Sequence, residues 1–217
     1  MTVRWFGPWQ DVRYPRAMID DDNEARLKRY RDKRDFSRSS EPQGGAKRKD
    51  GDPVFVIQKH DASSLHYDFR LEVDGVLKSW AAPKGPSTDP SDKRLAVATE
   101  DHPLDYAEFE GVIPDGEYGA GPVLIWDRGG YENITEKEDG VQPMAEALER
   151  GHALVRLKGE KLTGGYALQR IDDDEDQWLL VKMHDDDADA RRNPVSTEPE
   201  SVSSGREIDE IEAEDTD

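Results

Sequence analysis

Residues 65–82, LHYDFRLEVDGVLKSWAA, carry the strongest fold signal in the sequence. Apolar and polar side chains alternate over residues 65–73, which is the pattern of a β-strand with one buried face. The Asp74-Gly75 dipeptide is typical of a two-residue hairpin turn, and residues 76–82 then continue as a second strand. This stretch therefore predicts an antiparallel hairpin with one apolar side and one polar side.

Further strand signals lie on both sides of this hairpin. They cover residues 54–60, 94–102, 122–127, 153–159, 166–171 and 177–183. The Gly-rich residues 117–121 are interpreted as a hairpin turn, and residues 24–36 and 143–150 as short helices. Many short strands separated by turn signals predict a mainly β fold, namely a compact antiparallel β-barrel with short peripheral helices.

The composition favours one domain with solvated ends. The 217 residues are 34% hydrophobic and 36% charged, and none is a cysteine. A bound metal would therefore need histidine and carboxylate ligands, since thiolate sites and disulfides are excluded. Apolar runs are shorter than the roughly 20 residues that span a bilayer, and residues 1–10 lack the apolar centre of a signal peptide. We expect a cytoplasmic protein.

The formal net charge of the chain is −19. Thirteen acidic and three basic residues fall within residues 185–217, which we expect to form a disordered acidic tail. A basic surface is usual for proteins that bind nucleic acids, so this negative charge argues against nucleic-acid binding without excluding it. An acidic, lysine-poor surface is typical of proteins in high salt, where at about 1 M the Debye length is only about 3 Å. Plain solubility is the alternative explanation.

The polar side of residues 65–73 gathers side chains with distinct chemistry. His66, Asp68 and Arg70 share it, and a turn over residues 61–64 would bring His60 back beside them. Two histidines and a carboxylate suit Mn²⁺, Fe²⁺ or Zn²⁺ better than Mg²⁺ or Ca²⁺, and a guanidinium group suits phosphate oxygens. The alternative is an exposed strand face whose polar residues are merely solvated.

Residues 94–102 predict a second group of polar side chains. Arg94, Glu100 and His102 share one face of this stretch with two small alanines. From spacing alone, His102 could be a fourth metal ligand, a general acid, a phosphate binder or a surface residue. Lys84, in a Pro-Lys-Gly-Pro loop, is either a phosphate-facing cation or a solvated loop residue.

Four longer motifs point to a known family. They are RDF at residues 34–36, QKHDASSLHYDFRLEVDGVLKSWAAPKGPS at 58–87, DKRLAVATEDHPLDYAEFEG at 92–111 and IPDGEYGAG at 113–121. Together they resemble the 3′-phosphoesterase domain of bacterial ligase D and its stand-alone archaeal relatives, from about residue 30 to residue 182. The resemblance implies a β-barrel that uses Mn²⁺ to remove a 3′-terminal ribonucleoside and then the 3′-phosphate, leaving a 3′-OH.

The resemblance also implies roles for individual residues. The implied metal ligands are His60, His66 and Asp68. The residues implied to engage the scissile phosphate are Arg70, His102 and Tyr106. Supporting pocket positions match Gln58, Lys84, Arg94 and Glu100. Residues of an N-terminal segment that folds over the site match Arg34, Asp35 and Glu41.

These expectations divide the chain into an N-terminal extension (1–29), a 3′-phosphoesterase barrel domain (30–184) and the acidic tail (185–217). The implied partners are DNA or RNA–DNA 3′ ends and a separately encoded DNA ligase or polymerase. A membrane partner is not expected, and we expect a monomer. One alternative is a non-catalytic acidic binding module recruited to a ligase or polymerase. Another is a non-haem iron oxygenase, which would leave His60 and the phosphate-type cations unexplained.

Overall fold

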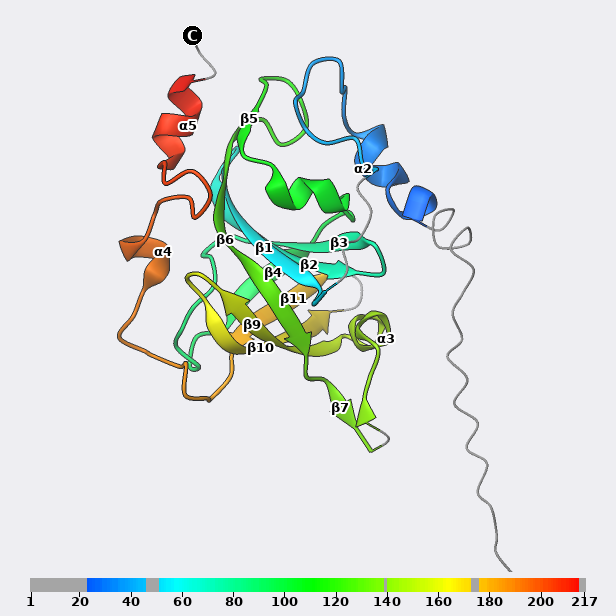
Figure 1. Cartoon of the computed structure of the whole chain (residues 1–217), viewed down its shortest axis with the longest axis vertical. Coiled ribbons are helices and arrows are strands. Elements are labelled where there is room, and N and C mark those ends of the chain that lie inside the picture. Colours follow the sequence, from blue (N-terminus) through cyan, green and yellow to red (C-terminus); the bar gives the residue numbers. More distant parts are fainter. Residues whose placement is uncertain (1–22, 46–50, 139, 173–175, 215–217) are drawn as a thin grey trace, which may run out of the picture.

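The computed structural model describes residues 23–45, 51–138, 140–172 and 176–214. Eight antiparallel strands close into a barrel in the order β1-β2-β3-β4-β11-β10-β9-β6, with β6 pairing back to β1 (Figure 1). The barrel strands are β1 (Val54–Asp61), β2 (Leu65–Val73), β3 (Val76–Ala82), β4 (Arg94–Ala98), β6 (Gly121–Asn133), β9 (His152–Gly159), β10 (Thr163–Asp172) and β11 (Gln177–Lys182). The predicted antiparallel β-barrel is confirmed.

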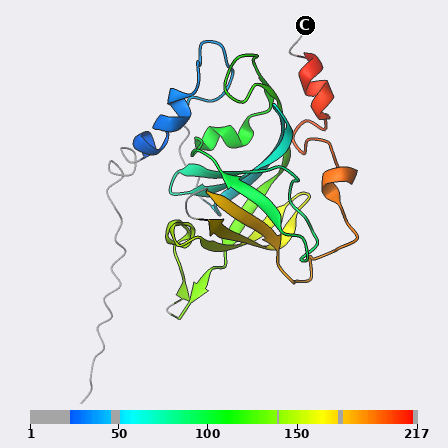
Figure 2. The same ribbon diagram turned by 180° about the vertical axis from the view of Figure 1, so that it is seen from behind.

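Short elements surround the barrel. The additional strands are β5 (Gly111–Ile113), which extends the sheet beside β6, and the β7 (Glu136–Lys137) and β8 (Gly140–Val141) hairpin. The helices are α2 (Lys28–Asp32), the 3₁₀ helix η1 (Leu104–Glu108), α3 (Met144–Glu149), α4 (Pro194–Thr197) and α5 (Ile208–Glu214). Helices α2 and α5 lie on opposite sides of the barrel in both views (Figures 1 and 2). In the described part of the chain, every helix is too short or too polar to cross a bilayer.

The hairpin at Asp74 and Gly75 forms as predicted. Both residues have positive φ, at 50° and 86°, which is the backbone of a type I′ turn. The turn places Val73 opposite Val76, and counting back along both strands places Arg70 opposite Ser79. A two-residue turn therefore sets the register that later brings these two polar side chains together.

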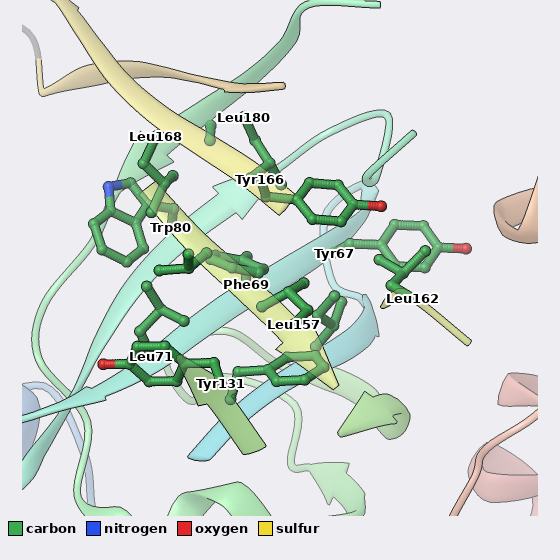
Figure 3. Packing of buried hydrophobic residues seen from close by; sticks show 14 of the residues in the cluster. Tyr67, Phe69, Leu71, Trp80, Tyr131, Leu157, Leu162, Tyr166, Leu168 and Leu180 are labelled. Carbon is green, nitrogen blue, oxygen red and sulfur yellow. The ribbon is translucent and has the colours of Figure 1, made fainter. Parts of the chain in front are cut away.

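Two hydrophobic cores lie on either side of the barrel wall. The apolar face of β2 points into the barrel, where Tyr67, Phe69 and Leu71 join the main cluster (Figure 3). A smaller cluster lies outside the wall and includes Tyr30, Leu77 and Tyr106. β1 borders both clusters, which explains why its six middle residues are all buried. Polar side chains on the outer face of β1 are consequently held away from water.

The strand predicted over residues 94–102 is shorter in the structure. β4 ends at Ala98, and Ala96 on this strand points into the main core with 0% exposure. After Ala98 the chain leaves the barrel wall, and His102 instead bridges Leu77 through its backbone. The prediction that Arg94 and His102 share one strand face is therefore wrong, because the period-2 alternation stops where the strand does.

The prediction of a disordered tail from residue 185 is wrong for residues 185–214. These residues have defined structure, and the rest of the predicted tail, residues 215–217, lies outside the described part. The indole Nε1 of Trp126 donates to the carbonyl of Glu198 at 2.7 Å, and Ile208 and Ile211 enter the main core. The acidic composition concealed these few apolar anchors, since burial of two isoleucines can outweigh a solvated acidic surface.

The anchoring role of α5 yields a stability prediction. Ile211 is 3% exposed, so Ile211→Ala should lower the free energy of unfolding by about 2–5 kcal/mol. Ile171→Ala is the matched control because Ile171 is 52% exposed, and it should change stability by less than about 0.5 kcal/mol. Urea denaturation of both variants would check this, and equal effects would show that α5 contributes no packing.

Candidate metal and phosphate site

The site is built on the outer faces of β1 and β2. His60 pairs directly with His66 across the two strands, and Gln58 pairs with Asp68 one step further along. Residues two apart on a strand share a face, so these four side chains and Arg70 all lie on the outer side of the barrel wall. The sequence prediction that His60, His66 and Asp68 come together is confirmed in the geometry.

The three candidate metal ligands are close enough to share one ion. Their ligand atoms all lie within 4.8 Å of one another. Nδ1 of His60 lies 3.5 Å from one oxygen of Asp68, and Nε2 of His66 lies 3.7 Å from the other. Two imidazoles and a carboxylate are a donor set that fits a divalent transition metal.

Backbone carbonyl groups select which imidazole nitrogen is free to bind. Nε2 of His60 donates to the carbonyl of Gly119 at 2.7 Å, and Nδ1 of His66 donates to the carbonyl of Ser64 at 2.9 Å. The remaining nitrogens, Nδ1 of His60 and Nε2 of His66, keep lone pairs on the side of Asp68. Orientation of this kind by outer partners is typical of histidine ligands to metals.

The carboxylate of Asp68 is held in its ionised form. Burial opposes ionisation, but the guanidinium of Arg70 and the neighbouring histidines outweigh it and lower the pKa of Asp68 well below its usual range. NH2 of Arg70 donates to this carboxylate at 3.0 Å. Asp68 is therefore charged at every pH at which the protein is expected to work, as a metal ligand must be.

Arg70 is fixed on three sides. Its Nε donates to the side-chain oxygen of Gln58 at 2.8 Å, and its NH1 donates to Ser79 at 2.9 Å. Gln58 is fixed in turn, because its amide donates to the carbonyls of Tyr106 and Phe109 at 3.1 and 2.9 Å. Arg70 uses three of its five N–H groups in this way. One N–H on each terminal nitrogen is left for two oxygens of an anion.

His102 and Tyr106 close the site from the side of η1. The ring centroids of His102 and Tyr106 are 4.7 Å apart, and the guanidinium of Arg70 lies 4.9 Å from the Tyr106 ring. The sequence-predicted phosphate group of Arg70, His102 and Tyr106 is therefore one cluster, immediately beside the metal ligands. All three residues are buried.

The N-terminal segment covers this cluster. Arg34 donates to Glu41 at 2.8 Å and to Glu100 at 3.2 Å, and its NH2 lies 3.3 Å from Nε2 of His102. Tyr106 donates its hydroxyl to the same oxygen of Glu41 at 3.0 Å. Arg34, Glu41 and Glu100 thus tie the segment to the phosphate cluster. The Arg34 side chain therefore lies against Nε2 of His102.

The environment of His102 keeps its imidazole neutral. Burial, together with the guanidinium groups of Arg70 and Arg34, lowers the pKa of His102 well below its usual value. Nδ1 of His102 donates to the carbonyl of Glu100 at 2.9 Å, which leaves the lone pair on Nε2 facing Arg34.

The lowered pKa of His102 yields a pH prediction. The unfolded chain binds a proton at His102 near pH 6.5 and the folded chain does not, so stability should fall as the pH drops below about 6.5. One such group contributes a slope of at most about 1.4 kcal/mol per pH unit. His102→Gln should flatten the decline between pH 7 and pH 5 in urea denaturation. An unchanged slope would contradict the assignment.

Comparison with known proteins identifies the family of this chain. The family model of the DNA ligase D 3′-phosphoesterase domain matches residues 58–170, which include the second half of β1 and the whole of β2 and η1. The chain belongs to this family. A multifunctional non-homologous end joining protein LigD from Pseudomonas aeruginosa is 50% identical over 188 residues, covering 84% of this chain and 22% of the relative.

Other ligase D relatives show similar sequence identity and coverage. The multifunctional non-homologous end joining DNA repair protein LigD of Mycobacterium tuberculosis is 51% identical over 159 residues, covering 73% of this chain and 20% of the relative. LigD of Mycolicibacterium smegmatis is 46% identical over 162 residues. The chain spans about a fifth of the length of these relatives.

Three residues that the ligase D resemblance selected lie apart from the cluster. Lys84 is exposed in the loop after β3, and Arg94 pairs with Asp92 at 2.7 Å. Asp35 is exposed and accepts hydrogen bonds from the backbone and hydroxyl of Ser37, which shapes the turn after Arg34. Their roles in the ligase D family site stay predictions for this chain.

Sequence reasoning missed three residues that shape this ligase D family site. Ser79 holds Arg70, Tyr30 packs 5.0 Å from the His102 ring, and Gly119 orients His60. Ser79 could have been predicted from the sequence, since the Asp74-Gly75 turn already implies its pairing with Arg70. Gly119 acts through its backbone, and residue type alone gives no signal for such a contact. The predicted hairpin turn that contains it is confirmed by the pairing of β5 with β6.

Proposed function

We propose that the protein is a Mn²⁺-dependent phosphoesterase that removes 3′-terminal ribonucleosides and 3′-phosphates from DNA or RNA–DNA ends. The observation that carries the proposal is the direct contact between the metal-ligand group and the phosphate cluster, through the 3.0 Å hydrogen bond from Arg70 to Asp68. Membership of the ligase D 3′-phosphoesterase family supports the same reaction.

His60, His66 and Asp68 would hold the ion. Mn²⁺, when bound, would polarise a phosphate oxygen and lower the pKa of a water ligand. Arg70 would hold two phosphate oxygens with its two remaining N–H groups and stabilise the charge that builds on them. Gln58 and Ser79 would keep the Arg70 guanidinium in place, so that little reorganisation is needed during the reaction.

His102 would act at the leaving 3′-oxygen or at a phosphate oxygen. Its buried imidazole starts neutral, so it would take up a proton as the phosphate binds and then donate it from Nε2. General acid catalysis of this kind contributes about 10²- to 10⁴-fold. Tyr106 would keep its proton, since burial and the neighbouring Glu41 raise the pKa of its hydroxyl well above the usual value. Its one hydroxyl proton is donated to Glu41 at 3.0 Å, so Tyr106 would donate to phosphate only after leaving Glu41.

An end-processing assay tests the proposal. A labelled duplex with a recessed 3′-phosphate and another with a single 3′-ribonucleotide are incubated with the protein, Mn²⁺ and molar KCl. Conversion to 3′-OH that EDTA abolishes is the expected result. Absence of conversion of both ends, across several salt concentrations and divalent metals, would contradict the proposed activity.

The ligase D relatives are named for non-homologous end joining, and this chain corresponds to about a fifth of their length. We therefore propose that a separately encoded DNA ligase or polymerase seals or extends the ends that this chain cleans, in the cytoplasm. The competing function is a non-catalytic acidic binding module. It predicts partner binding that EDTA leaves intact together with no end conversion, and pull-down of a purified ligase with and without EDTA separates the two.

A further inference from the structure

Tyr118 presents an exposed aromatic ring beside the metal ligands. It lies in the loop between β5 and β6, and the residue is 50% exposed. Among the large hydrophobic side chains that are exposed in the described part of the chain, it is the only aromatic one. The next residue, Gly119, accepts the 2.7 Å hydrogen bond from His60. The ring is therefore one residue away from the backbone group that orients a candidate metal ligand.

The N-terminal segment holds the loop that carries Tyr118. Glu117 pairs with Arg38 at 2.8 Å, and Arg38 also donates to the carbonyl of Asp115 at 3.3 Å. The segment after α2 and the loop after β5 accordingly lie side by side at one end of the barrel in both views (Figures 1 and 2). The residues before and after Tyr118 are thus both fixed, while its own side chain is half exposed. A ring held in this way can bind a partner at little cost in conformational entropy.

Two cations connect the Tyr118 ring to the phosphate cluster. Nζ of Lys33 lies 4.1 Å from the ring centroid, and Cζ of Arg34 lies 5.7 Å from it. Both cations bind the carboxylate of Glu100, at 2.9 and 3.2 Å, so they approach the ring from the side of that cluster. NH2 of Arg34 also lies 3.3 Å from Nε2 of His102. A single guanidinium group therefore spans the space between the Tyr118 ring and His102.

The exposed surface of the Tyr118 ring suits a second flat ring. Stacking of a nucleobase on an aromatic side chain strengthens the binding of single strands by about tenfold or more. Every nucleobase has a flat face, so such a contact holds a strand end whatever its sequence. The metal ligands and Arg70 account for the phosphate of a terminal nucleotide. A base attached to that phosphate through its sugar would lie on the side where Tyr118 is exposed.

We propose that Tyr118 binds the nucleobase of the 3′-terminal nucleotide by stacking, on the part of its ring that Lys33 and Arg34 leave exposed. The proposal rests on the proposed function and extends it, since the metal ligands and Arg70 would hold the terminal phosphate and Tyr118 the base of the same nucleotide. The ring touches the base and not the reacting phosphate. Its contribution is therefore expected mainly in KM, with a small effect on kcat.

Removal of the ring and removal of the base test this contact together. The substrate is a strand with a 3′-phosphate, either intact or lacking the base of its terminal nucleotide. Loss of the base should raise KM about tenfold for the unsubstituted protein. In Tyr118→Ala it should have no further effect, since both changes remove the same contact. Tyr118→Phe keeps the ring and should behave as the unsubstituted protein does.

A purely structural role of Tyr118 would give a different result. If Tyr118→Ala only disturbed Lys33 or Gly119, it would raise KM by the same factor for intact and base-free strands, and the proposal would be overturned. Coupling to the penultimate base in place of the terminal one would also overturn it. Val141→Ala is the matched control, because Val141 is 57% exposed and the β7–β8 hairpin lies at the opposite end of the barrel from β5 (Figure 1). It should leave KM unchanged for both strands.

Binding measured without catalysis distinguishes this proposal from the proposed function. Dissociation constants of the same labelled strands are measured by fluorescence anisotropy in EDTA. Loss of the terminal base should weaken binding to the unsubstituted protein about tenfold and leave binding to Tyr118→Ala unchanged. If no strand is converted in the kinetic assay, the proposed function fails, while this comparison still decides whether Tyr118 binds the base. Equal dissociation constants in all combinations, or no binding of any strand, would overturn the stacking proposal.

Discussion

Replacing His66 with alanine is expected to abolish Mn²⁺-dependent conversion of a 3′-phosphate end. The loss should exceed the roughly 10- to 100-fold that changes in outer partners of a metal usually cause, because a direct ligand is removed. The fold should remain, since His66 lies at the start of β2 with 19% of its side chain exposed, and its Nδ1 hydrogen-bonds to the backbone of Ser64. Loss of activity would then report on the metal ligands alone.

Two measurements distinguish loss of the metal from loss of the folded structure. Mn²⁺ binding is measured by isothermal titration, and end conversion by single-turnover kinetics. His152→Ala is the matched control, because His152 is an exposed histidine at the start of β9, away from the metal ligands. It should change neither quantity. A His66→Ala protein that retains normal Mn²⁺ binding and activity would disprove the metal assignment.

Arg70→Ala is expected to lower kcat by about 10²- to 10³-fold, the range found when one charge-stabilising donor is removed. Mn²⁺ binding should remain, because Arg70 contacts Asp68 as an outer partner and contributes no ligand atom. The variant also leaves the buried carboxylate of Asp68 without its cation, which costs about 3–5 kcal/mol of stability. Kinetics must therefore be measured well below its unfolding temperature.

Arg70→Lys is the informative companion variant. It keeps a positive charge beside Asp68 and should restore much of the lost stability. It should still be slow, since a single ammonium group cannot hold Gln58, Ser79 and two phosphate oxygens at once. Complete loss of Mn²⁺ binding in the folded Arg70→Lys protein would show that the division between metal and phosphate residues is wrong.

Local patterns predicted the parts of the site that depend on one strand or one turn. The alternation over residues 65–73 and the Asp74-Gly75 turn correctly indicate that His66, Asp68 and Arg70 share the outer face of β2. The same alternation failed after Ala98, because a strand period carries no information once the chain leaves the sheet. His102 reaches the site by a backbone bridge to Leu77, which no local pattern encodes.

Long-range contacts account for the remaining differences. The pairing of Arg34 with Glu41 and Glu100 depends on how the N-terminal segment crosses the barrel. The resemblance to ligase D suggested that this segment folds over the site, but it did not suggest these pairs. The acidic residues after 184 concealed Ile208 and Ile211, whose burial depends on packing of α5 against the barrel. Composition measures average solvation, whereas a few apolar side chains can fix a segment.

The two halves of the site depend on contacts between residues at different separations in the sequence. His60, His66 and Asp68 belong to one hairpin, whereas His102, Tyr106 and Arg34 meet them only across long loops. β1 must also pair with β6 to complete the wall. Local hairpins form in about 1–10 μs, while non-local strand pairing dominates slow folding. During refolding from denaturant, metal capture should therefore return before catalysis, and the lag between them would time the closure of the barrel.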